Sequence, residues 1–264
     1  MSYEFRNATQ AEMEQVGLMA AYVYAGAFGD GPDNITATSI RPEWTSCAFD
    51  GAKLITSFAA FPFNMRANGR AMSFAGITAV GTLPEYRRQG LVRKIMTQAL
   101  AQQRENGQGL AGLWASQAAI YQRYGFTPAG FRRHYAIDSV DVRFVDGDVG
   151  SALVRREPLD QSMEAVKAVY REFIAQRFGY LHRSSALWRE TVFAEQNEEP
   201  VHLALAYQGA EVVGYLAYTL RANKVNNVAR EQEIAIRDFC WLTPDAYRSL
   251  WSFLGSHDLV GRSV

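Results

Sequence analysis

The first 140 residues carry hydrophobic patterns of both helical and strand-like spacing. Apolar residues recur at helical spacing between residues 13 and 23, and Thr9 with Glu12 forms the capping-box pattern of a helix start. Strand-like runs follow at residues 45–49, 53–61 and 72–83, with turn signals at Asp50-Gly51 and Asn68-Gly69. The pattern predicts a helix followed by a group of strands that hairpins connect.

The pattern changes after Pro84. An amphipathic stretch predicts a helix over residues 91–105, and Asn106-Gly107 ends it. A buried strand at residues 110–115, a short helix at 117–124 and a last strand at 132–140 complete this half of the chain. The order of these helices and strands predicts a mixed α/β layer fold.

The chain beyond residue 150 repeats the same kind of order. Helical patterns cover residues 160–177 and 186–194, and strand patterns cover 201–207, 212–220 and 234–242. Thr243 and Pro244 then predict the cap and first residue of another helix. Because residues 141–150 are rich in aspartate and glycine, we interpret them as a linker and predict two domains, residues 1–140 and 151–264.

Composition narrows the possible classes of protein. The 264 residues are 48% hydrophobic, which is enough for a proper core, and 27 basic residues balance 27 acidic ones. This balance gives no reason to expect a nucleic-acid partner. Cys47 and Cys240 lie far apart and lack metal-ligand spacing, so we expect reduced thiols and no metal. With no signal-peptide pattern and no apolar run of membrane-spanning length, we expect a soluble cytoplasmic protein.

The segment at residues 77–92 carries the clearest chemical signal. A buried strand leads through a short loop containing Arg87, Arg88 and Gly90 into a helix. Unpaired N–H groups and the helix dipole at such a helix start can bind a pyrophosphate. The arginines add charge-assisted contacts, and Gly90 lets a ligand approach the backbone closely. A surface loop with solvated arginines is the alternative, but the combination with the strand, Pro84 and Gly90 favours phosphate binding.

Arg87-x-x-Gly90-x-Val92 resembles the coenzyme A loop of GNAT acetyltransferases, with Val92 where the general motif has glycine or alanine. A bulky apolar residue also stands there in the enhanced intracellular survival branch of this superfamily. The similarity to that branch continues through residues 115–126 and, more loosely, 238–247. It covers nearly the whole chain and implies two tandem GNAT-type mixed-sheet domains, of which the second is degenerate.

The resemblance also implies the roles of individual residues. The backbone at Ala79 and Val80 would polarise the carbonyl of acetyl-CoA, and Thr82 would pair with the pantetheine arm. The residues that would surround the pyrophosphate are Arg87, Arg88, Gln89, Gly90, Leu91 and Val92. Tyr121 would protonate the departing thiolate, since a phenol pKa of about 10 lies modestly above a thiol pKa of about 8.5. A purely structural place in the core is the alternative for Tyr121.

The acceptor side is predicted from the loop at residues 29–44. Asp30 and Trp44 supply a negative charge and an aromatic face, which suit a cationic amine. An exposed loop with an anchoring tryptophan is an equal alternative. The resemblance implies acetyl transfer to a primary amine of an aminoglycoside- or polyamine-like acceptor, by a homo-oligomeric enzyme.

The chain departs from the branch at two points. Gln117 replaces the usual acidic residue after Ser116. The branch's general base belongs to a third, sterol-carrier-like domain, which we expect to be absent because the sequence stops at Val264. The alternatives are therefore a non-catalytic acyl-CoA-binding sensor or scaffold, or a fragment of a longer acetyltransferase whose second domain lacks its last strands.

Overall fold

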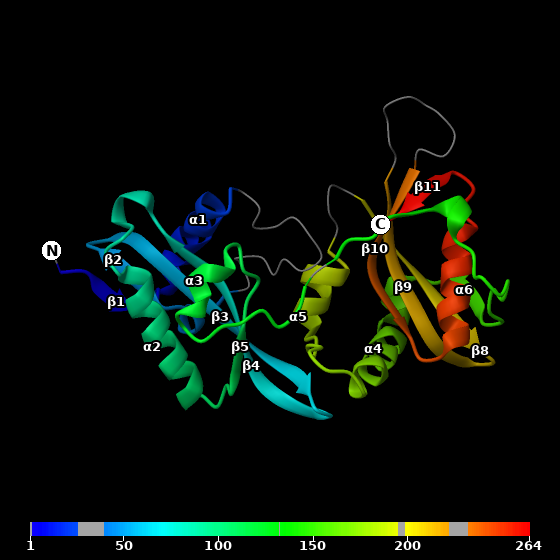
Figure 1. Cartoon of the computed structure of the whole chain (residues 1–264), viewed down its shortest axis with the longest axis horizontal. Helices are drawn as coiled ribbons and strands as arrows, with labels where there is room; N and C mark the ends of the chain where they lie inside the picture. The colour runs from blue at the N-terminus through cyan, green and yellow to red at the C-terminus, as the bar shows by residue number, and fades with distance from the viewer. Residues whose placement is uncertain (1, 26–39, 132, 195–198, 222–231) are drawn as a thin grey trace. The chain divides into compact units, whose positions relative to one another are not determined.

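The computed structural model describes residues 2–25, 40–131, 133–194, 199–221 and 232–264. It divides into two compact units (Figure 1). Unit 1 comprises residues 1–131 with 178–182, and unit 2 comprises residues 132–177 with 183–264. Each unit has its own mixed sheet, so the predicted α/β architecture of two sheets is confirmed.

Unit 1 is built on a five-stranded sheet of order β1-β2-β3-β4-β5. Its strands are β1 (Glu4–Arg6), β2 (Cys47–Asp50), β3 (Lys53–Ala67), β4 (Arg70–Thr82) and β5 (Leu110–Gly112). Neighbouring strands are antiparallel except β4 and β5, which are parallel. The predicted turn between β3 and β4 is confirmed, since Asn68 and Gly69 both have positive φ, as a two-residue hairpin requires.

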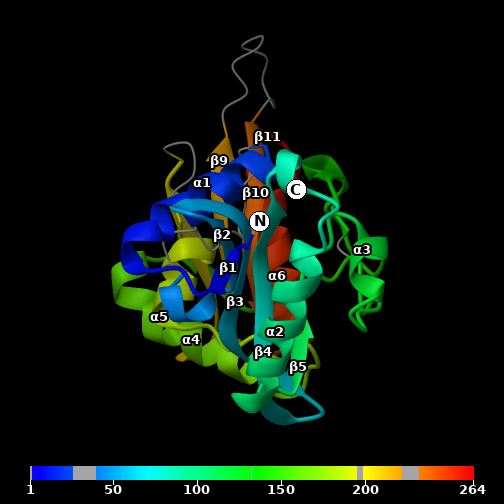
Figure 2. The same ribbon diagram turned by 90° about the vertical axis from the view of Figure 1, so that its left-hand side faces the viewer.

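Helices cover both faces of this sheet (Figure 2). A 3-10 turn at Gln10–Glu12 leads into α1 (Met13–Val23), and the predicted capping box is present, with Thr9 N donating to Glu12 Oε2 at 2.8 Å. Helix α1 packs against one face, and α2 (Leu91–Glu105) packs against the other through a separate hydrophobic cluster. The short helix α3 (Ala118–Gln122) adds Tyr121 to the cluster under α2.

A segment from late in the chain extends the sheet of unit 1. Leu181 forms an antiparallel bridge with Met65 of β3. Tyr180 O accepts from Arg66 N at 2.8 Å, and His182 N donates to Asn64 O at 2.7 Å. Residues 178–182 thus belong to unit 1, although the residues on either side of them belong to unit 2.

Unit 2 has a six-stranded sheet of order β6-β11-β10-β9-β8-β7. In chain order the strands are β6 (Ile137–Asp138), β7 (Leu153–Arg156), β8 (Val201–Gln208), β9 (Glu211–Arg221), β10 (Gln232–Trp241) and β11 (Val260–Ser263). Helix α4 (Leu159–Ala175) packs on one face, and α6 (Pro244–Gly255) packs on the other. The short helix α5 (Ser185–Leu187) runs into a π-helical turn at Trp188–Val192.

Three sequence predictions require correction. The last strand expected at residues 132–140 is reduced to Ile137–Asp138, and it pairs with β11 in unit 2 rather than with the first sheet. The helix expected at residues 186–194 is a single turn followed by a π-helical turn. Strand β7 was missed because Arg155 and Arg156 interrupt its apolar pattern. Local periodicity does not reveal which sheet a short extended segment joins.

Candidate active site

Strands β4 and β5 of the unit 1 sheet pair with each other over only part of the length of β4. They pair only at Phe74–Leu110, Ala75–Ala111 and Gly76–Gly112, whereas β4 continues to Thr82. Beyond Gly76, the side of β4 that faced β5 has no strand partner among the described residues. An open edge of this kind offers backbone donors and acceptors to an extended ligand.

A β-bulge distorts β4 within this open stretch. Ser57 pairs with Gly81 and Ala59 pairs with Thr78, so two residues of β4, Ala79 and Val80, stand opposite Phe58. Ala79 has a φ of 50°, which is an uncommon conformation for a residue with a side chain. Bulges redirect backbone groups, and they are over-represented near active sites.

Two side chains hold the bulge in place. Ser57 Oγ donates to Ala79 O at 2.7 Å, and Tyr24 OH donates to Val80 O at 3.0 Å. Because a trans peptide is planar, its N–H points opposite to its C=O. The Ala79 carbonyl faces the Ser57 hydroxyl, so the Val80 N–H is directed away from that hydroxyl. Tyr24 and Ser57 were not predicted as site residues, since neither belongs to a local motif.

Tyr121 is packed in the core under α2, with 6% of its surface exposed. Its ring meets Phe126 edge-on at a centroid distance of 6.1 Å. Burial, with smaller contributions from the neighbouring phenols of Tyr24 and Tyr124, raises the pKa of Tyr121 to about 12. Burial also raises the pKa of Tyr24. Tyr121 therefore keeps its proton throughout the physiological range, and the gap to a thiol pKa is wider than the unperturbed value of about 10 suggests.

The start of α2 is open and free of negative charge. Gly90 is the N-cap residue with a φ of 76°, no side chain caps the helix, and the first turn holds no acidic residue. A Cβ built on Gly90 would have no heavy atom within 4 Å. Arg87, Arg88 and Gln89 are exposed beside it. The structure thus presents unpaired backbone N–H groups and two guanidinium groups at one place.

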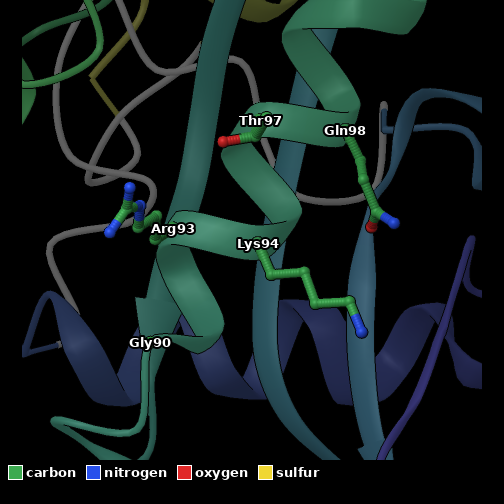
Figure 3. Close-up of a pocket in the computed structure, with 5 residues that line it drawn as sticks. All are labelled: Gly90, Arg93, Lys94, Thr97 and Gln98. Atoms are coloured by element: carbon green, nitrogen blue, oxygen red, sulfur yellow. The ribbon is translucent and has the colours of Figure 1, made fainter.

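Positive charge continues along the exposed face of α2 (Figure 3). Gly90, Arg93, Lys94, Thr97 and Gln98 line a shallow hollow there. Figure 3 shows Arg93 and Lys94 on opposite sides of the helix, one turn beyond Gly90. Lys94 Nζ lies 3.6 Å from the centroid of the Phe5 ring. These two cations were not predicted as site residues, because their spacing also fits an ordinary solvated helix face.

The remaining predicted residues fall into three groups. Thr82 is buried at the end of β4, with its hydroxyl 3.2 Å from that of Thr56, and Leu91 is likewise buried in the core. Trp44 closes a 3-10 turn at Pro42–Trp44, where the Arg41 guanidinium covers its ring at 5.0 Å. Asp30 lies outside the described residues.

The described residues hold neither a cluster of metal-ligating side chains nor a helix able to cross a membrane. In the parts of the chain that the structure describes, no cluster of three histidine, cysteine or acidic side chains could hold a metal ion. Among those same parts, no helix combines the length and apolar character that a membrane crossing needs.

Comparison with known families gives this geometry its context. The family described as Acetyltransferase (GNAT) domain matches residues 4–129, and a second family of the same description matches residues 179–264. The chain belongs to the GNAT acetyltransferases. The predicted family, with two GNAT domains in tandem, is therefore confirmed.

The relatives of this GNAT chain support its predicted resemblance to the enhanced intracellular survival branch. An uncharacterized N-acetyltransferase of Streptomyces coelicolor is 29% identical over 210 residues, which is 77% of this chain and 50% of the relative. N-acetyltransferase Eis of Mycobacterium tuberculosis is 28% identical over 192 residues, covering 71% of this chain and 46% of Eis. The chain thus spans about half the length of the curated relatives that it matches.

A solved structure supports the same fold. The crystal structure of Eis1 from Mycobacterium abscessus superimposes with a TM-score of 0.76 at 21% identity, over 99% of this chain and 64% of that protein. At this identity the likeness concerns the fold alone.

Proposed function

We propose that unit 1 binds acetyl-CoA and transfers its acetyl group to a primary amine of a small cationic acceptor, aminoglycoside- or polyamine-like. One observation carries the proposal: β4 leaves β5 at Gly76, bulges at Ala79 and Val80, and leads into a helix with an uncapped start. An open strand edge, a redirected N–H and an anion-binding helix terminus thus follow one another along the chain.

The coenzyme would lie along this path. The amide groups of the pantetheine arm would pair with the open edge of β4 as far as Thr82. The pyrophosphate would rest on the N–H groups of α2 around Gly90, and Leu91 and Val92 would contribute through their backbone. Arg87 and Arg88 would neutralise its charge beside Gln89, and Arg93 and Lys94 would add positive potential.

The bulge would stabilise the reaction's oxyanion. When a neutral amine attacks the thioester carbon, negative charge grows on the carbonyl oxygen, and the Val80 N–H would donate to it. The hydrogen bonds from Ser57 and Tyr24 to the bulge carbonyls support this role, because they hold the peptide before the substrate arrives. Preorganised donors of this kind need no rearrangement as the charge develops.

Tyr121 would act on the leaving group. Cleavage of the C–S bond leaves a thiolate, to which the phenol donates its proton, and the proton lost by the amine restores the phenol through solvent. The pKa of about 12 keeps the phenol protonated until that moment. Since this pKa exceeds that of the thiol, the transfer is uphill by itself, and the proton released by the amine makes the overall step favourable.

The acceptor site is proposed from two residues, Trp44 and Asp30. Trp44 would form a wall of the acceptor site rather than a cation–π contact, since Arg41 already covers its ring. Asp30 is proposed as the anionic partner of the acceptor. Homo-oligomer assembly and a cytoplasmic location stay predictions.

A free-thiol release assay with acetyl-CoA tests this function. The acceptor panel would contain aminoglycosides, spermidine and uncharged amines, and Tyr121→Phe would be compared with Tyr124→Phe as the matched control. We expect kcat to fall about 10²–10⁴-fold in Tyr121→Phe only, with coenzyme binding retained. Absence of acetyl-CoA binding would reject the proposal. Binding without turnover of any amine would favour an acyl-CoA-binding sensor or a fragment of a longer enzyme.

A further inference from the structure

A second cleft in unit 1 lies away from the start of α2. It has a volume of about 670 Å³ and is bounded by the end of β1, the turn at Pro42–Trp44, the outer edge of β3 and the second half of α2. Its walls are rich in carboxamide side chains, which include Asn64, Gln98, Gln102, Gln103, Asn106 and Gln108. We call it the amide cleft. Gln98 also lines the hollow of Figure 3, so the two depressions adjoin along α2.

Gln103 shows that the amide cleft has an unmet hydrogen-bonding capacity. This residue is only 8% exposed, and its Oε1 is buried without a hydrogen-bond partner among the described residues. A buried acceptor without a partner costs stability, and such atoms are rare in native proteins. Because this oxygen is shielded from solvent, a ligand hydroxyl would remove the cost once the Gln103 amide turns toward the cleft.

The charges of the amide cleft are already balanced. Arg6 forms a two-pronged contact with Glu12, at 2.7 and 2.8 Å, and also contacts Glu4 at 3.0 Å. Glu43 lies 3.9 Å from Arg41. No other charged side chain among the described residues lines the cleft. A neutral ligand therefore fits better than an ion.

The outer edge of β3 disfavours a peptide ligand. Phe58 and Asn64 direct their carbonyl groups outward, to Ser46 N and His182 N respectively. The backbone N–H and C=O groups of the even-numbered residues in this part of β3 therefore point toward its outer edge. Pro62, which lines the cleft, is one of these residues and has no N–H to donate. An added strand would lose a ladder hydrogen bond there.

We propose that the amide cleft binds a neutral, polyhydroxylated molecule such as a sugar ring. A carboxamide offers an acceptor oxygen beside N–H donors, which matches neighbouring hydroxyl groups that both donate and accept. Two of these amides are also bonded within the protein, since Gln102 Nε2 donates to Asn106 Oδ1 at 3.3 Å and Gln108 Nε2 donates to Phe74 O at 3.4 Å. Phe5, which is half-buried, lines the same cleft and supplies apolar contact for the C–H face of such a ring. Binding in the amide cleft does not require acetyl-CoA, although Trp44 lines both this cleft and the proposed acceptor site.

Saturation-transfer difference NMR with methyl α-glucopyranoside and myo-inositol tests this binding. We expect signals from at least one probe with the wild-type protein, and unchanged signals when acetyl-CoA is added. Gln103→Leu should weaken binding at least tenfold and raise Tm by about 2–4 °C, because it removes a buried polar group without a partner. Gln122→Leu, an exposed position on α3, is the control and should leave binding unchanged.

Three results would overturn the proposal. The first is absence of signal for both probes at 20 mM with the wild-type protein. The second is undiminished binding by Gln103→Leu. The third is a fall in Tm of Gln103→Leu by several degrees, which would show that the amide already has a stabilising partner such as ordered water.

Discussion

In each unit one sheet strand leads into a helix, but the two helix starts have opposite chemistry. In unit 1, β4 leads to α2, whose start has no side-chain cap and no acidic residue. In unit 2, β10 leads to α6, where Thr243 Oγ1 accepts from Ala246 N at 3.1 Å and Pro244 offers no N–H. Asp245 adds a carboxylate to the first turn of α6. The same strand-to-helix junction thus has an electrostatic environment that favours an anion in unit 1 and disfavours one in unit 2.

The β-bulges of β4 and β10 differ in the same way as the two helix starts. In β10 the register shifts between Ile236 and Asp238, and the inserted residue, Arg237, buries its guanidinium against the carbonyls of Thr191 and Ala194 at 2.7 and 3.1 Å. Asp238 pairs with Arg183 and accepts from Tyr215 OH. Unit 2 thus fills its bulge region with its own ion pairs and hydrogen bonds. A shared fold therefore brings the same backbone elements together in both units. The side chains at the bulge and the helix start determine whether these elements stay open to a ligand.

The largest effect is expected from a substitution that gives the start of α2 the negative charge found at the start of α6. Val92 occupies the second position of α2, as Asp245 does in α6, so Val92→Asp places a carboxylate beside the proposed pyrophosphate. We expect the Kd of acetyl-CoA to rise roughly 100-fold, because like charges about 5 Å apart repel by about 3 kcal/mol at an effective dielectric constant of 20. Isothermal titration calorimetry measures this change. Val92→Asn controls for shape, and an equal loss in both variants would contradict the electrostatic explanation.

An intermediate effect is expected from loosening the bulge of β4. Tyr24→Phe removes the hydrogen bond to the Val80 carbonyl while keeping the ring. We expect kcat to fall about fivefold with little change in KM for acetyl-CoA, since one hydrogen bond is worth about 1 kcal/mol and the oxyanion forms only in the reaction. Tyr22→Phe, on the exposed side of α1, is the matched control. A rise in KM at constant kcat would show instead that Tyr24 serves binding.

The smallest expected effect concerns the ionisation of Tyr121. Its pKa is raised, so the proton is held below about pH 12 and lost only above it, whereas an unperturbed phenol is half ionised near pH 10. Ultraviolet difference titration of the wild-type protein against Tyr121→Phe should therefore show no phenolate from this residue up to pH 10.5. A transition near pH 10 would mean that Tyr121 is open to water.

Much of the site of unit 1 could be predicted because its signals are local. The bounds of α2 match the predicted residues 91–105, and the segment from Ala79 to Val92 is contiguous in sequence and in the fold. Contacts between distant segments could not be predicted. Tyr24 and Ser57 reach the bulge from α1 and β3, and the amide of Gln103 looks like an ordinary helix residue until its burial is known.

The bridge between Met65 and Leu181 has a consequence for biosynthesis. During translation β3 leaves the ribosome long before residues 178–182. The outer edge of β3 therefore lacks its hydrogen bonds to residues 178–182 until α4 has been synthesised. Separating the halves by cutting the gene after residue 131 would leave that edge permanently bare and prone to pair with other chains. A protease nick within residues 141–150 would have a milder result, because residues 178–182 could keep their backbone hydrogen bonds to β3 without a continuous chain.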